Sequence, residues 1–140
     1  MRYVAFIHTD DAGGFGISFP DFPGCISDGD TVEAALNRGE AALAFHVEGM
    51  AEDELPLPAP RGVDAILSDP DLAAWREGAQ LAYVPLILDG GSPRRVNVSL
   101  DPGLLDAIDT EATRRGMTRS AFLSSAARAE IRAMGPRRVG

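Results

Sequence analysis

The sequence has no long hydrophobic run, and its longest apolar stretch, residues 81–88, is interrupted by Pro85. Because a membrane-spanning helix needs about 20 consecutive apolar residues, this stretch cannot cross a bilayer. Cysteine is almost absent as well: the single Cys25 excludes an internal disulfide and is typical of a reducing compartment. We therefore expect a cytoplasmic protein that does not enter membranes.

Lysine is absent, and all 13 basic residues are arginines, which against 21 acids leave a formal net charge of −8. The charge is divided unevenly: residues 1–92 hold 16 acids and 4 arginines (−12), whereas residues 93–140 hold 5 acids and 9 arginines (+4). A basic segment suits phosphate and an acidic one suits a basic protein, although solvated arginines without a partner would give the same pattern. The sign changes at the DGGSP cluster of residues 89–93, which predicts a domain boundary.

Residues 1–89 have the pattern of a small α+β domain with an antiparallel sheet. Three short segments rich in β-branched and aromatic residues favour strands: residues 2–8, 15–19 and 25–27. A Gly-rich turn over residues 10–14 separates the first two segments, so we expect a β-hairpin.

A long amphipathic helix is predicted within residues 28–53. Its apolar side chains recur at helical spacing on one stripe: Val32, Leu36, Leu43, Val47 and Met50. Asp30 and Glu33 stand three residues apart where this stripe begins, so we expect them to form a capping box at the helix start. Gly39 is expected to weaken the helix slightly.

A connector, a short helix and a further strand follow. The three prolines of residues 55–62 indicate an extended connector. Asp69 and Pro70 are typical of the start of a short helix. Residues 81–88 favour a buried strand, which Pro85 places at a sheet edge or beside a bulge.

Residues 93–134 have the pattern of one strand and two helices. The strand is expected over residues 94–100, and residues 135–140 are expected to form a flexible tail that includes Arg137 and Arg138. Asp101 and Pro102 are expected to begin the first helix, which runs to Arg115 and is ended by Gly116. Thr118 is expected to cap the second helix. A lone strand cannot satisfy its backbone hydrogen bonds, and so small a unit buries little surface, so we expect a second copy to complete it.

This order of elements resembles the ribbon-helix-helix family. The matching residues are the alternating RRVNVSL of residues 94–100, the Pro-initiated amphipathic helix and RGMTRSAFL of residues 115–123. The resemblance implies a homodimer in which the two strands pair antiparallel and project into the major groove of operator DNA. On the strand, Val96, Val98 and Leu100 would face the helices.

The same resemblance assigns DNA contacts to two groups of residues. Arg bonds guanine, Asn bonds adenine and Ser bonds either, so the base-reading candidates are Arg95, Asn97 and Ser99. Free amides at a helix N-terminus favour phosphate, so the phosphate candidates are Thr118, Arg119 and Ser120, together with Arg94 on the other face of the strand. A solvated strand face would show the same alternation.

A second resemblance concerns the front part. Residues 20–50 read PDFPGCISDGDTVEAALNRGEAALAFHVEGM, and this order resembles the HicB family of bacterial antitoxins. Over residues 2–60 the resemblance implies a truncated, inactive ribonuclease H fold that binds and blocks HicA, a small basic RNA-cleaving toxin. The expected function is that of a type II antitoxin that also represses its own operon. The resemblance leaves room for a tetramer and places the toxin contacts on no particular residue.

Two other functions are compatible with the sequence: a stand-alone transcription regulator with a ligand-sensing front domain, and a metal-dependent nuclease of the ribonuclease H type. The nuclease needs several carboxylates converging on Mg²⁺. Asp10 and Asp11 lie in the Gly-rich turn, and the helix glutamates, Glu33, Glu40 and Glu48, are about two turns apart. His8 and His46 have no neighbours at metal-ligand spacing. We therefore expect no catalytic residue, no metal site and no cofactor.

Overall fold

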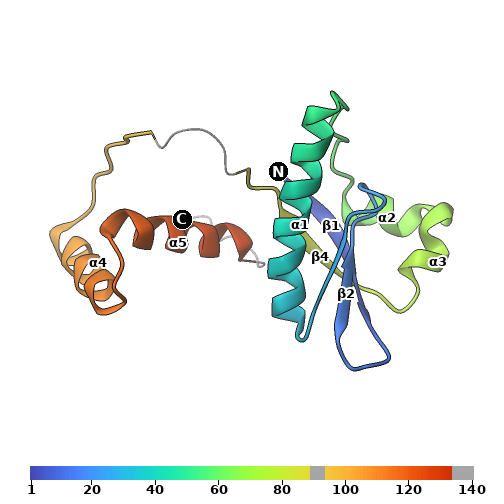
Figure 1. Ribbon diagram of the computed structural model, residues 1–140, viewed down its shortest axis with the longest axis horizontal. Helices are drawn as coiled ribbons and strands as arrows, with labels where there is room; N and C mark the ends of the chain where they lie inside the picture. The colour runs from blue at the N-terminus through green and yellow to red at the C-terminus, as the bar shows by residue number, and fades with distance from the viewer. Residues whose placement is uncertain (89–93, 134–140) are drawn as a thin grey trace. The chain divides into compact units, whose positions relative to one another are not determined.

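The computed structural model describes residues 1–88 and 94–133 of the chain. It divides into two compact units, residues 1–89 and 90–140 (Figure 1). The expected boundary cluster at residues 89–93 and the expected tail at residues 135–140, with Arg137 and Arg138, lie outside the described residues.

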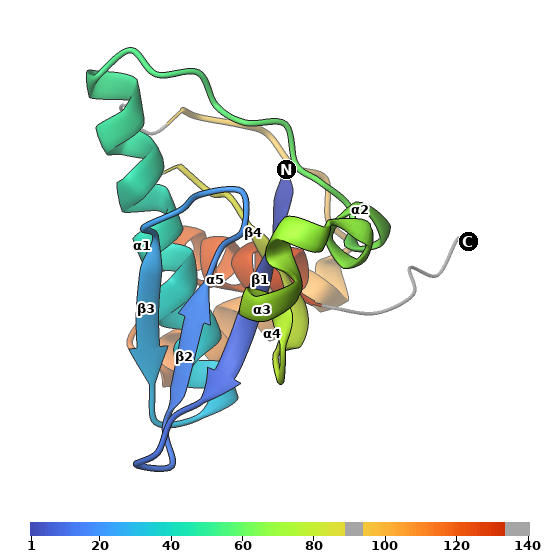
Figure 2. The ribbon, with the colours of Figure 1, turned by 90° about the vertical axis from the view of Figure 1, so that its right-hand side faces the viewer.

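The first unit is built on a four-stranded antiparallel sheet (Figure 2), as predicted for the front part. Its strands lie in the order β3-β2-β1-β4: β1 (Arg2–Thr9), β2 (Phe15–Ser18), β3 (Ile26–Gly29) and β4 (Gln80–Pro85). β1 and β2 form the expected hairpin, with Thr9 opposite Phe15. β4 pairs with β1 at one edge of the sheet, and Pro85 ends this edge strand, where its missing N–H costs no ladder bond.

The long helix α1 (Val32–Glu52) begins one residue later than the capping box predicts. Thr31 is the N-cap, and its hydroxyl accepts a hydrogen bond from the Ala34 amide at 3.0 Å. Glu33 therefore stands at the second helical position, too early to close a box, and the assignment of Asp30 as the cap was wrong. A side chain at Gly29 would collide with the backbone of Ala35, so the chain enters the helix pressed against its first turn.

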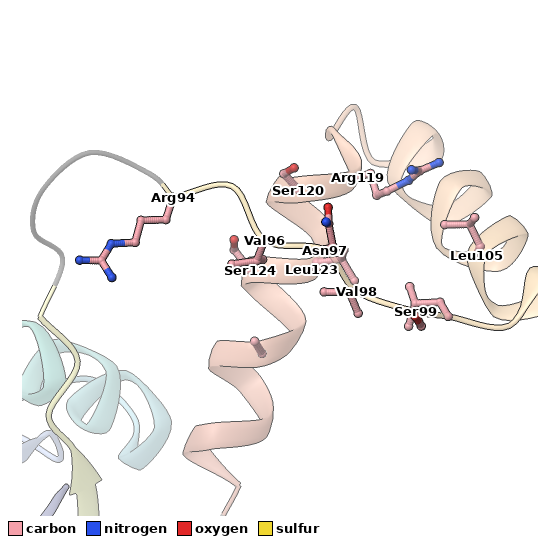
Figure 3. A pocket seen from close by; sticks show the side chains of 12 residues that line it. Arg94, Val96, Asn97, Val98, Ser99, Leu105, Arg119, Ser120, Leu123 and Ser124 are labelled. Atoms are coloured by element: carbon pink, nitrogen blue, oxygen red, sulfur yellow. The ribbon is translucent and has the colours of Figure 1, made fainter.

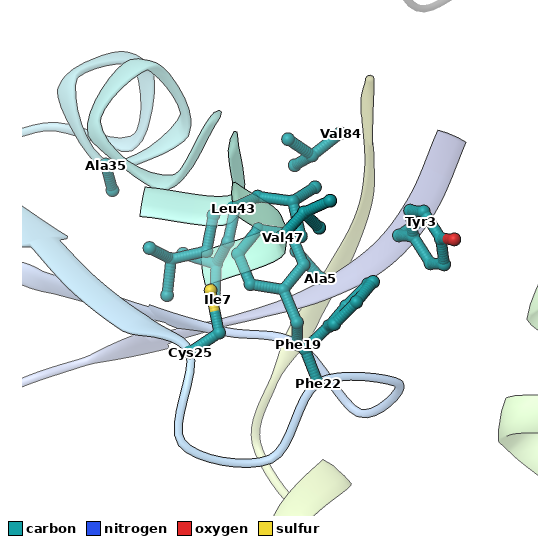
Figure 4. Packing of buried hydrophobic residues seen from close by; sticks show 11 residues of the cluster. Tyr3, Ala5, Ile7, Phe19, Phe22, Cys25, Ala35, Leu43, Val47 and Val84 are labelled. Carbon is teal, nitrogen blue, oxygen red and sulfur yellow. The ribbon is translucent and has the colours of Figure 1, made fainter. Parts of the chain in front are cut away.

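One face of the sheet packs against α1 and holds the larger core (Figure 4). Alternate residues of β1 and the predicted stripe of α1 meet there, in a cluster that includes Tyr3, Ala5, Ile7, Phe19, Phe22, Leu43 and Val47. Gly39 is buried in this contact, and a Cβ at Gly39 would lie 2.7 Å from the Cδ1 of Ile17. Gly39 therefore allows the helix to approach β2 closely, which offsets its low helix propensity.

The opposite face of the sheet is covered by three short helices: α2 (Val63–Ser68), the 3₁₀ helix η1 (Pro70–Leu72) and α3 (Ala73–Arg76). Val4 and Phe6 of β1 are buried there against Ile66 and Leu72. Trp75 packs edge-on against Phe6, with ring centroids 5.6 Å apart. The Asp69 cap is confirmed, because its carboxylate accepts from the Asp71 amide at 2.9 Å. Within residues 1–88 and 94–133, no helix is long and apolar enough to span a bilayer.

The proline-rich connector of residues 55–62 is extended, as expected, and side chains hold it in place. The Tyr3 hydroxyl donates to the Pro58 carbonyl at 2.7 Å. The Asp21 carboxylate, whose side chain is only 4% exposed, accepts from the Arg61 Nε at 2.6 Å and from the Arg61 amide at 3.0 Å. Arg61 also donates to Asp69 at 2.9 Å, so one guanidinium joins the PDFPG turn to the start of η1.

The second unit consists of an extended segment and two helices, α4 (Pro102–Arg114) and α5 (Arg119–Arg132). Both predicted caps are confirmed: Asp101 accepts from the Leu104 amide at 2.8 Å, and Thr118 accepts from the Ala121 amide at 3.1 Å. Gly116 has a φ of +66° and ends α4, with the Met117 amide donating back to the Ala112 carbonyl at 2.8 Å. This is the Schellman arrangement, which favours glycine.

The Asp21–Arg61 pair predicts a stability difference between two aspartates of the first unit. Asp21→Ala should lower the free energy of unfolding by about 1.5–3 kcal/mol, because the guanidinium and the backbone amide of Arg61 lose their buried, charged acceptor. Asp28→Ala should cost less than about 1 kcal/mol, because the Asp28–Arg38 pair is exposed on both sides. Urea unfolding followed by fluorescence of Trp75, the only tryptophan, measures both. Equal losses in the two variants would contradict the role of Asp21.

Candidate nucleic-acid interface

The predicted strand at residues 94–100 is extended but forms no β-ladder within the single chain. Every residue from 94 to 99 is exposed, and the valines stand out, with Val96 75% exposed and Val98 66% exposed. The expectation that these valines pack on the helices is therefore not met within one chain. An isolated extended segment has no neighbouring strand to accept its amides, so it cannot close a sheet by itself.

An open groove of about 900 Å³ lies between this segment and α5 (Figure 3). The groove brings together five of the predicted DNA-contact residues: Arg94, Asn97, Ser99, Arg119 and Ser120. The apolar part of its wall comes from the two valines, three leucines and an alanine: Val96, Val98, Leu100, Leu105, Leu123 and Ala127. Arg95 and Thr118 are not among the residues that line it. The wall is therefore mixed, with apolar and polar side chains alternating along the extended segment.

The N-terminus of α5 presents the predicted phosphate candidates, but two of them already have partners. The Thr118 hydroxyl caps the helix. Arg119 forms a bidentate pair with Asp109 of α4, through Nε at 2.8 Å and a terminal nitrogen at 2.7 Å. Hydrogen bonding by Arg119 lowers the pKa of the Asp109 carboxyl, so this carboxyl stays ionised at neutral pH. No local sequence pattern indicates this pair, which crosses the turn between the helices.

Two further arginines of the second unit are also compensated. Arg114 and Arg115 both donate to Glu111, and these hydrogen bonds lower the pKa of Glu111 to about 2. The guanidinium of Arg115 also lies 5.6 Å from the ring centroid of Phe122, which links the end of α4 to α5. Arg94 and Arg95, by contrast, make no ion pair or hydrogen bond with any described residue. The arginines of the second unit that make no ion pair or hydrogen bond with a described residue therefore include the two on the extended segment.

Three titratable side chains of the first unit, Asp10, Cys25 and His46, lie in structural positions. Asp10 accepts from the Ala12 and Gly14 amides at 2.9 and 2.7 Å, which fixes the hairpin turn. Burial raises the pKa of the Cys25 thiol to about 11, so the reactive thiolate is scarce at neutral pH. His46 packs edge-on against Phe22. In the part of the chain that the structure describes, no three His, Cys, Asp or Glu side chains are grouped to hold a metal ion.

Comparison with known proteins places both units in one family. The family model for HicB-like antitoxins of bacterial toxin–antitoxin systems matches residues 3–127. Over 96 residues the chain is 32% identical to an uncharacterized 14.9 kDa protein of Haemophilus phage HP1, which covers 69% of this chain and 71% of the phage protein.

Two solved structures are similar as well. The first is the crystal structure of the Burkholderia pseudomallei antitoxin HicB, with a TM-score of 0.54, 33% identity, and 91% of this chain and 96% of that chain covered. The second belongs to a HicA3 and HicB3 toxin–antitoxin complex, with a TM-score of 0.51, 33% identity, and 62% of this chain and 99% of that chain covered. Since the family match extends through most of both units, the chain belongs to the HicB-like antitoxin family.

Proposed function

We propose that this chain is the antitoxin of a type II toxin–antitoxin pair, which neutralises a HicA-like toxin through its first unit and represses its own operon through its second. The observation that carries the proposal is the family match over residues 3–127, which includes both units. Similarity to a chain of a HicA3 and HicB3 complex supports a toxin as the partner. The protein acts in this role by binding, without a catalytic step of its own.

The toxin-binding role agrees with the charge of the first unit. Residues 1–92 have a net charge of −12, and a negatively charged surface attracts basic partners and repels acidic ones. A basic RNA-cleaving toxin is therefore steered toward this unit at a rate that falls as salt is added. Neutralisation follows when the bound antitoxin keeps RNA from the toxin.

The proposed DNA-binding role rests on the extended segment of residues 94–100, which has no partner strand within the single chain. A second copy supplies the missing strand, and the exposed Val96 and Val98 then gain a partner across the groove. The resulting ribbon-helix-helix dimer carries Arg95, Asn97 and Ser99 on its outer face, where a two-stranded ribbon reaches base edges in the major groove. Arg94, Thr118, Arg119 and Ser120 then border the ribbon as phosphate contacts.

Co-expression with the product of the neighbouring gene tests the proposed function. The two proteins should purify together, and growth arrest caused by the neighbour alone should be relieved when this chain is present. A chain that neither co-purifies with the neighbour nor relieves arrest is not its antitoxin. A regulator with a ligand-sensing front domain would instead bind operator DNA in the absence of any toxin gene beside it.

Two arginine substitutions separate base reading from phosphate contact. Arg95→Ala should weaken binding to the operator by about 1–3 kcal/mol and relax its sequence preference, with little effect on random DNA.

Arg119→Ala should weaken binding to operator and random DNA alike and flatten the dependence of log K on log salt by about one unit. Binding to labelled duplexes across a salt series measures both effects.

Asp109→Asn is the matched control for Arg119, because it removes the competing carboxylate and leaves the arginine in place. DNA affinity should rise in this variant. If Arg95→Ala weakens random and operator DNA equally, Arg95 is a phosphate contact. If Arg119→Ala leaves the salt slope unchanged, Arg119 does not contact DNA.

A further inference from the structure

Phe45 lies on the outward face of α1 and is 78% exposed, the highest value among the exposed large hydrophobic side chains of the described residues. Residues four positions apart on a helix are neighbours, so Ala41 and Gly49 flank it one turn before and one turn after. Both neighbours are small and exposed. The ring therefore stands above its surroundings, with room on both sides for the side chains of a partner.

The fold does not require an aromatic residue at this position. The sheet-facing side of α1 is filled by other residues, including Leu43 and Val47, and belongs to the larger core. Single exposed apolar residues are common on protein surfaces, so exposure alone would not distinguish Phe45. What distinguishes it is the charge that surrounds it on the same helix.

The C-terminal half of α1 carries acids where the helix disfavours them. Glu48 and Glu52 lie on the outward face, one and two turns beyond Phe45, and Asp53 and Glu54 follow. Glu48 and Glu52 repel each other at i,i+4 spacing, and the negative end of the helix dipole disfavours acids near the helix C-terminus. The last turn holds no basic residue, and Glu48 and Glu52 make no ion pair with any described residue. The end of α1 also extends beyond the strands of the sheet (Figures 1 and 2).

We propose that this surface, Phe45 between Ala41 and Gly49 with Glu48 and Glu52 beside it, is the docking face for the toxin. It fits a partner that offers an apolar pocket rimmed by Arg or Lys side chains, in which an aromatic anchor is buried and the flanking acids are neutralised. This inference rests on the proposed function, since the toxin is the basic partner that it names. Pairing with the first unit of a second copy is disfavoured, because residues 1–92 hold 16 acids against 4 arginines and two such surfaces repel each other.

Phe45→Glu in the full chain tests the anchor. The dissociation constant for the HicA-like neighbouring gene product should rise at least tenfold, because the substituted side chain brings a charge into the apolar pocket. Leu67→Glu is the matched control: Leu67 is 50% exposed on α2, on the opposite side of the sheet, and this variant should bind as the unsubstituted chain does. Both variants should keep the urea transition reported by Trp75, since both positions are exposed.

Charge reversal at the two acids supplies a second test with a different readout. Glu48→Arg with Glu52→Arg should slow association with the toxin about tenfold at low salt and reduce its salt dependence. The same double variant should not lower the melting temperature, because positive charge suits a helix C-terminus. A purely structural role for these acids would lower stability and leave the association rate unchanged.

The outcomes separate this inference from the proposed function. If the unsubstituted chain forms no complex with the neighbouring product, the proposed function fails. If that complex forms and Phe45→Glu binds as tightly, the docking face lies elsewhere and the inference is wrong. If Phe45→Glu instead lowers the mass of the chain measured alone by light scattering, the face joins copies of this chain, and the inference is again wrong.

Discussion

An extended strand must find partners for its backbone amides and carbonyls, and the two units meet this requirement differently. β1 lies between β2 and β4, and its alternate side chains are buried on both faces of the sheet. The rest of the first unit is organised around that strand: α1 covers one face and the short helices cover the other. Residues 94–100 are extended as well, but no strand of the same chain lies beside them. The dimer is proposed for this reason, since a second copy supplies the neighbouring strand that the single chain lacks.

Net charge alone gives an incomplete description of the second unit. Arg114, Arg115 and Arg119 are held by Glu111 and Asp109 on the same helix pair. The Asp109–Arg119 pair joins α4 to α5, and all three pairs leave less positive charge available to DNA than the count of arginines indicates. The first unit shows the opposite case at the end of α1, where acids remain uncompensated beside an exposed aromatic ring. The charges on which the two proposals depend, at the end of α1 and on the extended segment, are among those that make no ion pair with a described residue.

The elements that were predictable from the sequence are those that one or two neighbouring residues decide. Asp101, Gly116 and Thr118 mark helix ends through local hydrogen bonds, and all three positions were correct. The start of α1 was wrong because Asp30 and Thr31 are both good caps, and the close approach of Gly29 to the helix favours the second. The six residues of α2 are too few to show a helical period.

The contacts that escaped prediction join residues distant in sequence. The Asp21–Arg61 pair spans forty residues, and the Asp109–Arg119 pair crosses a turn between helices. No local pattern encodes such pairs, because they depend on how the elements pack. For the same reason, the alternation of residues 94–100 indicated a strand but not which surface would cover its valines.

The dimeric ribbon is tested most directly by hydrogen–deuterium exchange of the amides in residues 94–100 of the full chain. A paired ribbon predicts slow exchange at alternate amides of this segment at high protein concentration, and loss of that protection on dilution, as the dimer dissociates. Fast exchange of every amide in the segment, at all concentrations at which α4 and α5 stay protected, would contradict the ribbon and with it the proposed mode of DNA binding.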